Sequence, residues 1–232
     1  QERSTQDLFS FERTIKALED RNIIDRDRCH LPNFETLLRR SAQGHGMTRP
    51  ELAVLSAYCK MEVYRRLLEL APGAIPDLDD YLALYFPEEV VTRYESSLSS
   101  HLLGREISMT MITNQIIDHA GATFFFDVER ETGASVDQIV RAYLLTDDLY
   151  NCWGMKQTVM SLDSKVPCKE QYLALRSIEE ALRRSVCWLL SGEQRGRLER
   201  IEGDRVKYAG FLAKYQSLLP WELPRTIQKR YR

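Results

Sequence analysis

Glycine and proline divide this chain into segments of helical length, and that spacing restricts its fold more than any other feature. The breakers recur at intervals of roughly 15 to 30 residues, whereas turns in an all-β sandwich recur about every 8–12 residues. Between them apolar residues repeat every three or four positions, as do Phe11, Ile15 and Leu18 in residues 9–22. No segment shows convincing strand-like alternation, and the triplet Phe124–Phe126 is the best strand candidate. We therefore predict an all-α fold, an irregular multi-helix bundle forming a single compact domain with no significant sheet.

The breakers also predict where each helix begins and ends. We expect helices over residues 9–22, a short piece within 30–46, then 48–71, 77–86, 87–98, 105–119, 122–132, 135–150, 151–162, 167–190 and a charged helix over 193–219. In outline, residues 1–46 form an N-terminal helical segment and loop, 47–192 the helical core, and 193–232 a charged helix with a truncated tail. No internal repeat of fixed period indicates a solenoid.

Two sequence patterns mark helix starts. Thr48 and Glu51 have the spacing of a capping box, with Pro50 in the first turn, where a missing N–H costs nothing. Ser135 and Gln138 repeat the pattern. At a helix end, Gly121 is a candidate left-handed cap, and His119 just before it could place a positive imidazole at the carboxyl terminus.

Composition excludes several classes of function. The 232 residues are 44% hydrophobic and 28% charged, which suits a buried core. A formal charge of −2 gives no general attraction to nucleic acid or to an anionic membrane, and no apolar run approaches the ~18 residues of a membrane span. Because the chain opens on Gln1 and a polar stretch with no signal segment, we read it as a piece of a longer protein, the alternative being a removed tag or propeptide.

The cysteines indicate a reducing compartment. They are odd in number and widely spread, at Cys29, Cys59, Cys152, Cys168 and Cys187. A disulfide framework favours an even, clustered set, and a zinc site favours close pairs. We expect free thiols and a cytoplasmic protein.

Candidate catalytic, cofactor and metal residues are weak at every position, and we assign none. Gly44-His45-Gly46 lacks the third glycine and the preceding strand of a nucleotide-binding loop, and is read as a loop between helices. The four histidines, His30, His45, His101 and His119, stand at loops or helix ends. A metal or thiolate pair at Cys29-His30 lacks a second pair. Acidic Asp77, Asp79 and Asp80 fit a helix N-terminus better than a cation site. Cys152-Trp153 and Cys187-Trp188 read as core packing.

Residues 128–141 suggest a helix-turn-helix, with a tight turn at Gly133 and a cap at Ser135. The start of its second helix would place Asp137 against phosphates of the same sign, and only Arg141 is basic nearby. A structural helix corner is favoured over DNA contact. Residues 225–232 carry four positive charges and no acid, which we read as one solvated helix face.

The segment from Gly46 to Tyr58 closely resembles the Thr-Arg-Pro-Glu-Leu-Ala-Val-Leu motif of the large-subunit, NAD-dependent glutamate dehydrogenases of bacteria, in the region after their catalytic domain. Further stretches resemble the family in the same order: residues 21–26, Leu31-Pro32, Tyr85-Phe86-Pro87, 114–124, 131–135, 141–143, Leu162-Asp163, Val166-Pro167 and 188–190. The resemblance covers about residues 10 to 192. Gln115, Asp118 and His119 depart from its pattern, so a function resting on that polar patch does not carry over.

The resemblance implies a parent that oxidises L-glutamate to 2-oxoglutarate and ammonium with reduction of NAD. The family's catalytic residues and dinucleotide fold lie upstream, so it implies an inactive fragment with no cofactor of its own. Expected partners are the catalytic domain or neighbouring subunits of a homo-oligomer, with no nucleic acid or membrane. Candidate contact residues are Met109, Tyr150, Met155 and Met160, since interfaces enrich these types, although core packing is favoured for each one singly. The alternatives are a stand-alone helical interaction module and a DNA-binding regulator.

Overall fold

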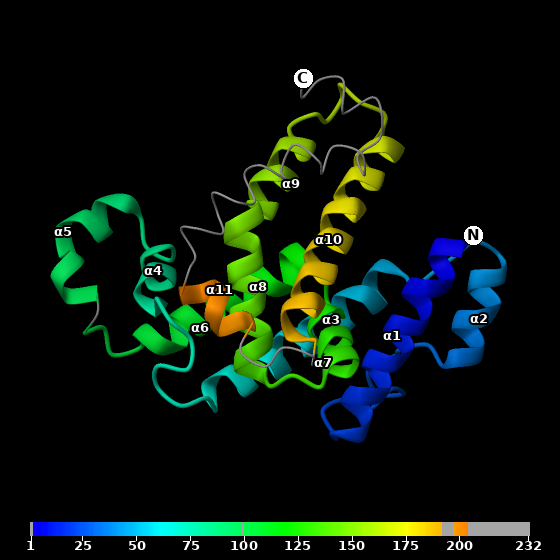
Figure 1. Cartoon of the computed structure of the whole chain (residues 1–232). Helices are drawn as coiled ribbons and strands as arrows, with labels where there is room; N and C mark the ends of the chain where they lie inside the picture. Colours follow the sequence, from blue (N-terminus) through cyan, green and yellow to red (C-terminus); the bar gives the residue numbers. More distant parts are fainter. Residues whose placement is uncertain (1, 99, 192–196, 204–232) are drawn as a thin grey trace. The chain divides into compact units, whose positions relative to one another are not determined.

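The computed structural model describes residues 2–98, 100–191 and 197–203, and these residues form helices connected by turns and loops (Figure 1). In chain order the eleven helices are α1 (Glu2–Asp20), α2 (Phe34–Ala42), α3 (Arg49–Leu68), α4 (Leu78–Ala83), α5 (Glu88–Leu98), α6 (Gly104–Ala120), α7 (Phe124–Thr132), α8 (Val136–Tyr150), α9 (Cys152–Met160), α10 (Cys168–Leu190) and α11 (Arg197–Gly203). No strand occurs among the described residues. The all-α prediction is confirmed, and the triplet Phe124–Phe126 is buried at the start of α7.

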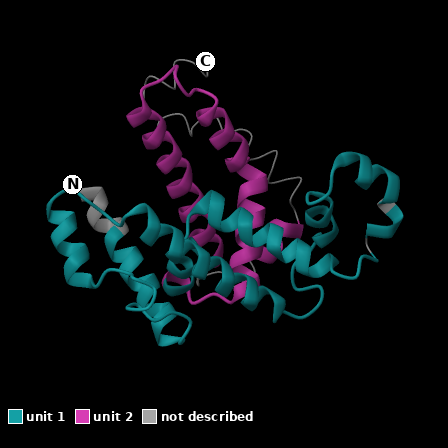
Figure 2. Cartoon of the chain, turned by 180° about the vertical axis from the view of Figure 1, so that it is seen from behind, with its two compact units in different colours: residues 1–130 teal, residues 131–232 magenta. Residues whose placement is uncertain are grey.

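Contacts group the chain into two compact units, residues 1–130 and 131–232 (Figure 2). The division falls inside α7, whereas the sequence suggests one domain punctuated after residues 46 and 192. The difference has a simple physical reason. Hydrophobic periodicity identifies the face that a helix buries, but it does not identify the helix that covers that face.

Unit 1 is built on the packing of α3 against α6. Leu55, Cys59 and Val63 of α3, with Ile112 and Ile116 of α6, are completely buried. Helix α1 packs with α2, while α4 packs with both α5 and α6. Within this unit the α1–α2 pair and the α4–α5 pair lie at opposite ends of the α3–α6 layer (Figures 1 and 2).

Unit 2 is centred on the long helix α10, which packs against α8, α9 and α11. Its buried stripe repeats at helical spacing through Ala174, Ile178, Leu182 and Val186. Facing helix α8 buries Tyr143 completely. A partly buried ion pair joins Lys156 Nζ on α9 to Glu179 Oε1 on α10 at 2.6 Å.

Side-chain hydrogen bonds cap the first turns of α3 and α8. Glu51 N–H donates to Thr48 Oγ1 at 3.4 Å, and Thr48 N–H donates to Glu51 Oε2 at 2.7 Å, so the first turn of α3 carries a capping box. Ser135 N–H donates to Gln138 Oε1 at 3.0 Å at the start of α8.

At the end of α6, Gly121 has φ +100° and ψ 155°. The predicted left-handed cap is therefore wrong in detail, because this ψ is extended rather than left-handed helical, although the positive φ still favours glycine. Gly133, with φ +65°, ends α7 as expected.

The junction between α8 and α9 depends on a single residue. Asn151 has φ +49° and ψ 47°, so it lies in the left-handed region. Its Oδ1 accepts the Gly154 N–H at 3.2 Å, which caps α9. A Cβ on Gly154 would lie 2.5 Å from the Asn151 side-chain amide, so the cap requires glycine at this position.

Most of the charged C-terminal segment lies outside the described residues. Helix α11 covers Arg197–Gly203 of the helix expected over residues 193–219. The basic run at residues 225–232, like the breakers Pro220 and Pro224, also falls outside the described ranges.

Candidate functional site

A group of charged side chains in unit 1 surrounds Glu129 on α7. Arg66 of α3 donates from Nη1 to Glu129 Oε2 at 3.1 Å and makes a second bond from Nη2 to Oε1. Arg21, in the turn after α1, donates to the same Oε2 at 3.0 Å. One carboxylate therefore connects three segments that are far apart in the sequence; we call Glu129, Arg21 and Arg66 the Glu129 cluster.

The two arginines of the cluster also cover aromatic rings. The guanidinium carbon of Arg66 lies 5.1 Å from the ring centroid of Phe125, and that of Arg21 lies 5.8 Å from the centroid of Phe126. Both rings are buried. Cation–π attraction and apolar packing thus add to the ion pairs at this point.

Glu129 is held in its charged form. Partial burial alone would raise its pKa, but the hydrogen bonds and charges of Arg66 and Arg21 outweigh burial, and the pKa is lowered from its ordinary value. A carboxylate occupied by two guanidinium groups cannot readily accept a proton from a substrate. The cluster is therefore suited to holding these three segments together rather than to acid–base catalysis.

Neighbouring carboxylates are paired in the same way. Glu62 of α3 is 2% exposed and accepts from Arg65 Nε at 2.9 Å, with Arg21 Nη1 3.7 Å away. A surface hollow of about 290 Å³ lies beside the cluster. It is lined by Arg13, Thr14, Ala17, Arg21, Phe126, Glu129 and Arg130.

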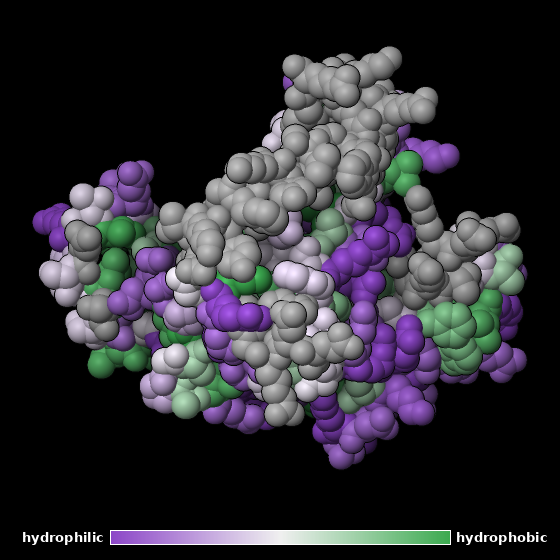
Figure 3. Space-filling view, viewed as in Figure 1, coloured by the Kyte–Doolittle hydropathy of each residue, from purple (hydrophilic) through white to green (hydrophobic). Residues whose placement is uncertain are grey.

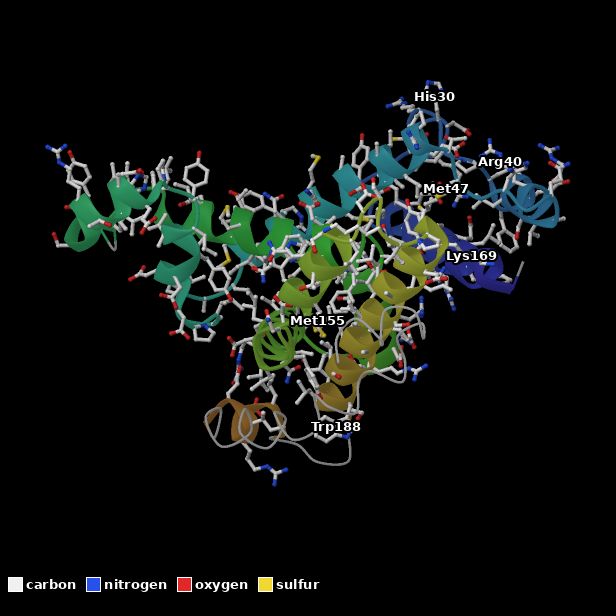
Figure 4. The ribbon with its side chains drawn as sticks, turned by 90° about the horizontal axis from the view of Figure 1, so that it is seen from above. His30, Arg40, Met47, Met155, Lys169 and Trp188 are labelled. Carbon is white, nitrogen blue, oxygen red and sulfur yellow. The ribbon has the colours of Figure 1, made fainter. Side chains whose placement is uncertain are left out.

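A second hollow of about 350 Å³ lies in unit 2, lined by Glu131, Thr132, Cys187, Trp188 and Ser191. Trp188, near the carboxyl end of α10, is labelled in Figure 4. Burial, followed by the charge of Glu131, raises the pKa of Cys187 to about 11. The thiol is thus protonated at neutral pH and is a poor nucleophile.

The four histidines stay apart from any catalytic arrangement. His30 lies in the turn between α1 and α2, with φ +53°, and His45 lies in the loop before α3 (Figure 4). His101 Nδ1 accepts the Leu103 N–H at 3.1 Å, and its ring contacts Phe86. His119 is half-buried in the last turn of α6.

Within the described ranges, no group of three histidine, cysteine or acidic residues could hold a metal ion. Asp79 and Asp80 lie in the first turn of α4, where negative charge favours the helix dipole. Asp77 precedes them in the left-handed region, with φ +55°. The acidic group therefore has the local role expected of a helix start.

The predicted helix corner at residues 128–141 is present as α7, a turn at Gly133, and α8. Arg141 is engaged within unit 2, donating from Nε to Glu202 Oε1 at 3.0 Å. Ser135 Oγ donates to Asp137 Oδ1 at 2.6 Å at the exposed start of α8. An acidic helix start with its nearest arginine paired does not fit a phosphate-binding surface.

The polar patch that departs from the family pattern takes part in packing. Asp118 of α6 forms an ion pair with Lys60 of α3, Nζ to Oδ1, at 2.8 Å. Both neighbours in the patch, Gln115 and His119, are half-buried on the same helix. The patch thus contributes an α3–α6 contact.

The four candidate contact residues do not form one surface. Met109 is 2% exposed in the core of unit 1, so the core packing favoured for each of these residues singly is confirmed for it. A methionine fills a core as readily as an interface. Met155, labelled in Figure 4, and Tyr150 are half-buried, and Met160 is 45% exposed.

Sequence patterns did not indicate a set of exposed large apolar side chains around α4 and α5 in unit 1. It consists of Leu84, Tyr85, Tyr94, Leu102 and Leu103, which we call the α4–α5 apolar surface. The helix predicted over residues 87–98 suggested an ordinary buried face. A signal was present in the pair Leu102-Leu103, which falls between two helices rather than on the face of one.

None of the helices in the described part of the chain is long and apolar enough to cross a membrane.

Comparison with known proteins identifies the family of this helical region. The family model for the C-terminal part of glutamate dehydrogenase matches residues 44–232, so the chain belongs to this family.

Its curated relatives are named NAD-specific glutamate dehydrogenases. The protein of Halomonas elongata is 33% identical over 187 residues, covering 81% of this chain and 12% of the relative. That of Pseudomonas aeruginosa is 31% identical over 194 residues, covering 82% of this chain and 12% of the relative. That of Mycobacterium tuberculosis is 34% identical over 139 residues, covering 59% of this chain and 8% of the relative. The chain thus spans about an eighth of the length of the first two relatives.

Proposed function

We propose that this chain is a non-catalytic helical region of an NAD-dependent glutamate dehydrogenase. The parent enzyme would convert L-glutamate and NAD to 2-oxoglutarate, ammonium and NADH. One observation carries the proposal: a family match over residues 44–232 to the C-terminal part of enzymes in which the similar region fills only 12% of the polypeptide. NAD would bind elsewhere in the parent.

The chemistry of the described residues favours a structural role over a catalytic one. Glu129 and Glu62 are occupied by arginines, and burial raises the pKa values of the Cys59 and Cys152 thiols to about 12. Of the described residues that line the two hollows, Glu129 is paired with arginines and Cys187 is a protonated thiol at neutral pH, so neither is set up for nucleophilic or acid–base catalysis. The region would instead hold helical faces against the catalytic domain or a neighbouring subunit.

The proposal includes a cytoplasmic, homo-oligomeric parent. All five cysteines are free, as suits a reducing compartment. Homo-oligomers are common among soluble enzymes, and a helical appendage of this size can contribute to subunit contacts.

Purified full-length protein provides the test. It should reduce NAD when L-glutamate is supplied, and the increase in NADH absorbance measures this reaction. A full-length protein that fails to do so with glutamate while reducing NAD with another amino acid would refute the substrate. A natural gene product little longer than 232 residues would favour the rival reading, a stand-alone helical interaction module.

A further inference from the structure

Helix α5 buries none of the side chains whose burial is described, although apolar residues recur at helical spacing in its sequence on both sides of a kink at Tyr94, where φ is −124° and ψ is 23°. Val90, Val91 and Leu98 are only half-buried, and Tyr94 is 50% exposed. Helix α5 packs only with α4 among the helix pairs in substantial contact. An amphipathic surface helix normally turns its apolar stripe to a core. The apolar side of α5 therefore lacks a covering element within unit 1.

The exposed apolar residues beside α5 are held together by local contacts. The rings of Phe86 and His101 lie 5.7 Å apart, which brings the segment after α4 to the segment before α6. His101 N–H donates to Leu98 O at 2.9 Å, so the end of α5 reaches the same place. The α4–α5 apolar surface is thus assembled from three neighbouring segments.

Exposure on this surface is unusually high for large apolar side chains. Leu102 is 96% exposed, Leu84 is 66% exposed and Tyr85 is 57% exposed. Single exposed leucines are common on protein surfaces, whereas several together, rimmed by polar residues, mark an interaction site. In Figure 3 hydrophobic and hydrophilic residues lie side by side over α4 and α5.

The exposed charged residues of α4 and of the first turn of α5, next to this surface in the sequence, are acidic. Asp79, Asp80, Glu88 and Glu89 are exposed, while Arg93 is the basic residue of the same stretch and stacks on Tyr94. Two copies of this surface placed face to face would bring carboxylates against carboxylates. Like charge therefore argues against a second copy as the occupant, and favours a partner with lysine or arginine around an apolar centre.

We propose that the α4–α5 apolar surface docks on the upstream, catalytic part of a glutamate dehydrogenase polypeptide, at an apolar patch edged by basic side chains. This inference rests on the function proposed above. Relatives that this chain matches over 12% of their length supply a large further part of the polypeptide to cover it. The contact would explain why α5 keeps an apolar stripe that unit 1 does not bury.

Photo-crosslinking in the full-length protein tests the contact. A benzoylphenylalanine placed at Leu102 should crosslink to peptides upstream of this region, identified by mass spectrometry. The matched control is the same residue at Tyr172, which is 64% exposed on α10. Crosslinking at Leu102 no stronger than at Tyr172, or only to a second copy of residues 1–232, would overturn the proposal.

Hydrogen exchange gives a second readout that needs no bulky probe. Amides of residues 84–103 should exchange at least about tenfold more slowly in the full-length protein than in the 232-residue chain. The double reversal Glu88→Lys with Glu89→Lys should remove that protection, whereas Glu35→Lys on α2 should leave it. Equal exchange in the two proteins contradicts the docking.

Glutamate-dependent NAD reduction by the same full-length preparation separates the two proposals. An active enzyme without crosslinks at Leu102 refutes the docking surface and leaves the proposed function standing. An inactive protein with strong upstream crosslinks refutes the function and retains the contact.

Discussion

Arg66 on α3 and Glu129 on α7 are 63 positions apart in the sequence, yet they form a two-point ion pair, with Nη1 donating to Oε2 at 3.1 Å. Their side chains are largely buried, with 15% and 23% exposure. Paired arginine and carboxylate forks of this kind fix geometry as well as adding energy. The pair ties the buried phenylalanines at the start of α7 to the α3–α6 layer of unit 1.

Replacing Glu129 with glutamine should destabilise unit 1. The change leaves Arg66 and Arg21 without their carboxylate, and because the site is partly open to solvent we expect a loss of about 1–2 kcal/mol in the free energy of unfolding. Urea denaturation followed by circular dichroism measures it. Glu89→Gln on exposed α5 is the control and should change stability by no more than about 0.5 kcal/mol. Equal effects of the two variants would contradict a tie at Glu129.

Acid should weaken unit 1 through the same carboxylate. The pKa of Glu129 is lowered below its ordinary value of 4.5, so the unfolded chain binds this proton more readily than the folded chain. Its contribution is therefore fully present above about pH 4.5 and is lost as the pH falls through the folded value. Urea denaturation over a pH series should show a smaller acid loss in Glu129→Gln than in the unaltered protein. A parallel pH dependence in both would refute the assignment.

Asn151 should be hard to replace at the α8–α9 junction. Asn151→Ala removes the cap on Gly154 N–H and puts alanine, which tolerates the left-handed region less well than asparagine, at this position, for a combined cost of about 1–3 kcal/mol. Asn151→Gly loses the cap but keeps the backbone conformation, so it should cost less. Thermal melts of the two variants rank them. An alanine variant as stable as the glycine variant would mean that the backbone conformation contributes nothing.

The thiols should differ sharply in reactivity. Burial raises the pKa values of Cys59 and Cys152 to about 12, while Cys168 is exposed at the start of α10. Brief treatment of the folded protein with iodoacetamide near pH 8 should label Cys168 and spare Cys59 and Cys152, as read by peptide mass spectrometry. Labelling in denaturant provides the control, since all five should then react. Fast native labelling of Cys59 would show that α3 opens readily.

Helix boundaries were predictable because their signals are local. Thr48, Glu51 and Gly133 act within one turn of their own helix, and the structure places helix ends beside them. The ψ angle of Gly121 was not predictable, since a positive φ permits more than one glycine conformation.

Long-range partners could not be read from the sequence. No residue near Glu129 in the sequence indicates that it pairs with Arg66, 63 positions away. Likewise, the sequence does not show that Asp118, which departs from the family pattern, pairs with Lys60 on α3. The same limit explains Met109, which shares its residue type with interfaces but lies in the core. It also explains α5, whose apolar spacing predicts burial that unit 1 does not provide.

We propose that these helices support a dehydrogenase whose catalytic residues lie elsewhere in the polypeptide. Titration of the purified 232-residue chain with NAD, alone and with L-glutamate, by calorimetry and by NADH absorbance tests this most directly. We predict no saturable heat of binding and no NADH. Saturable NAD binding, or glutamate-dependent NADH formation by this chain alone, would contradict it.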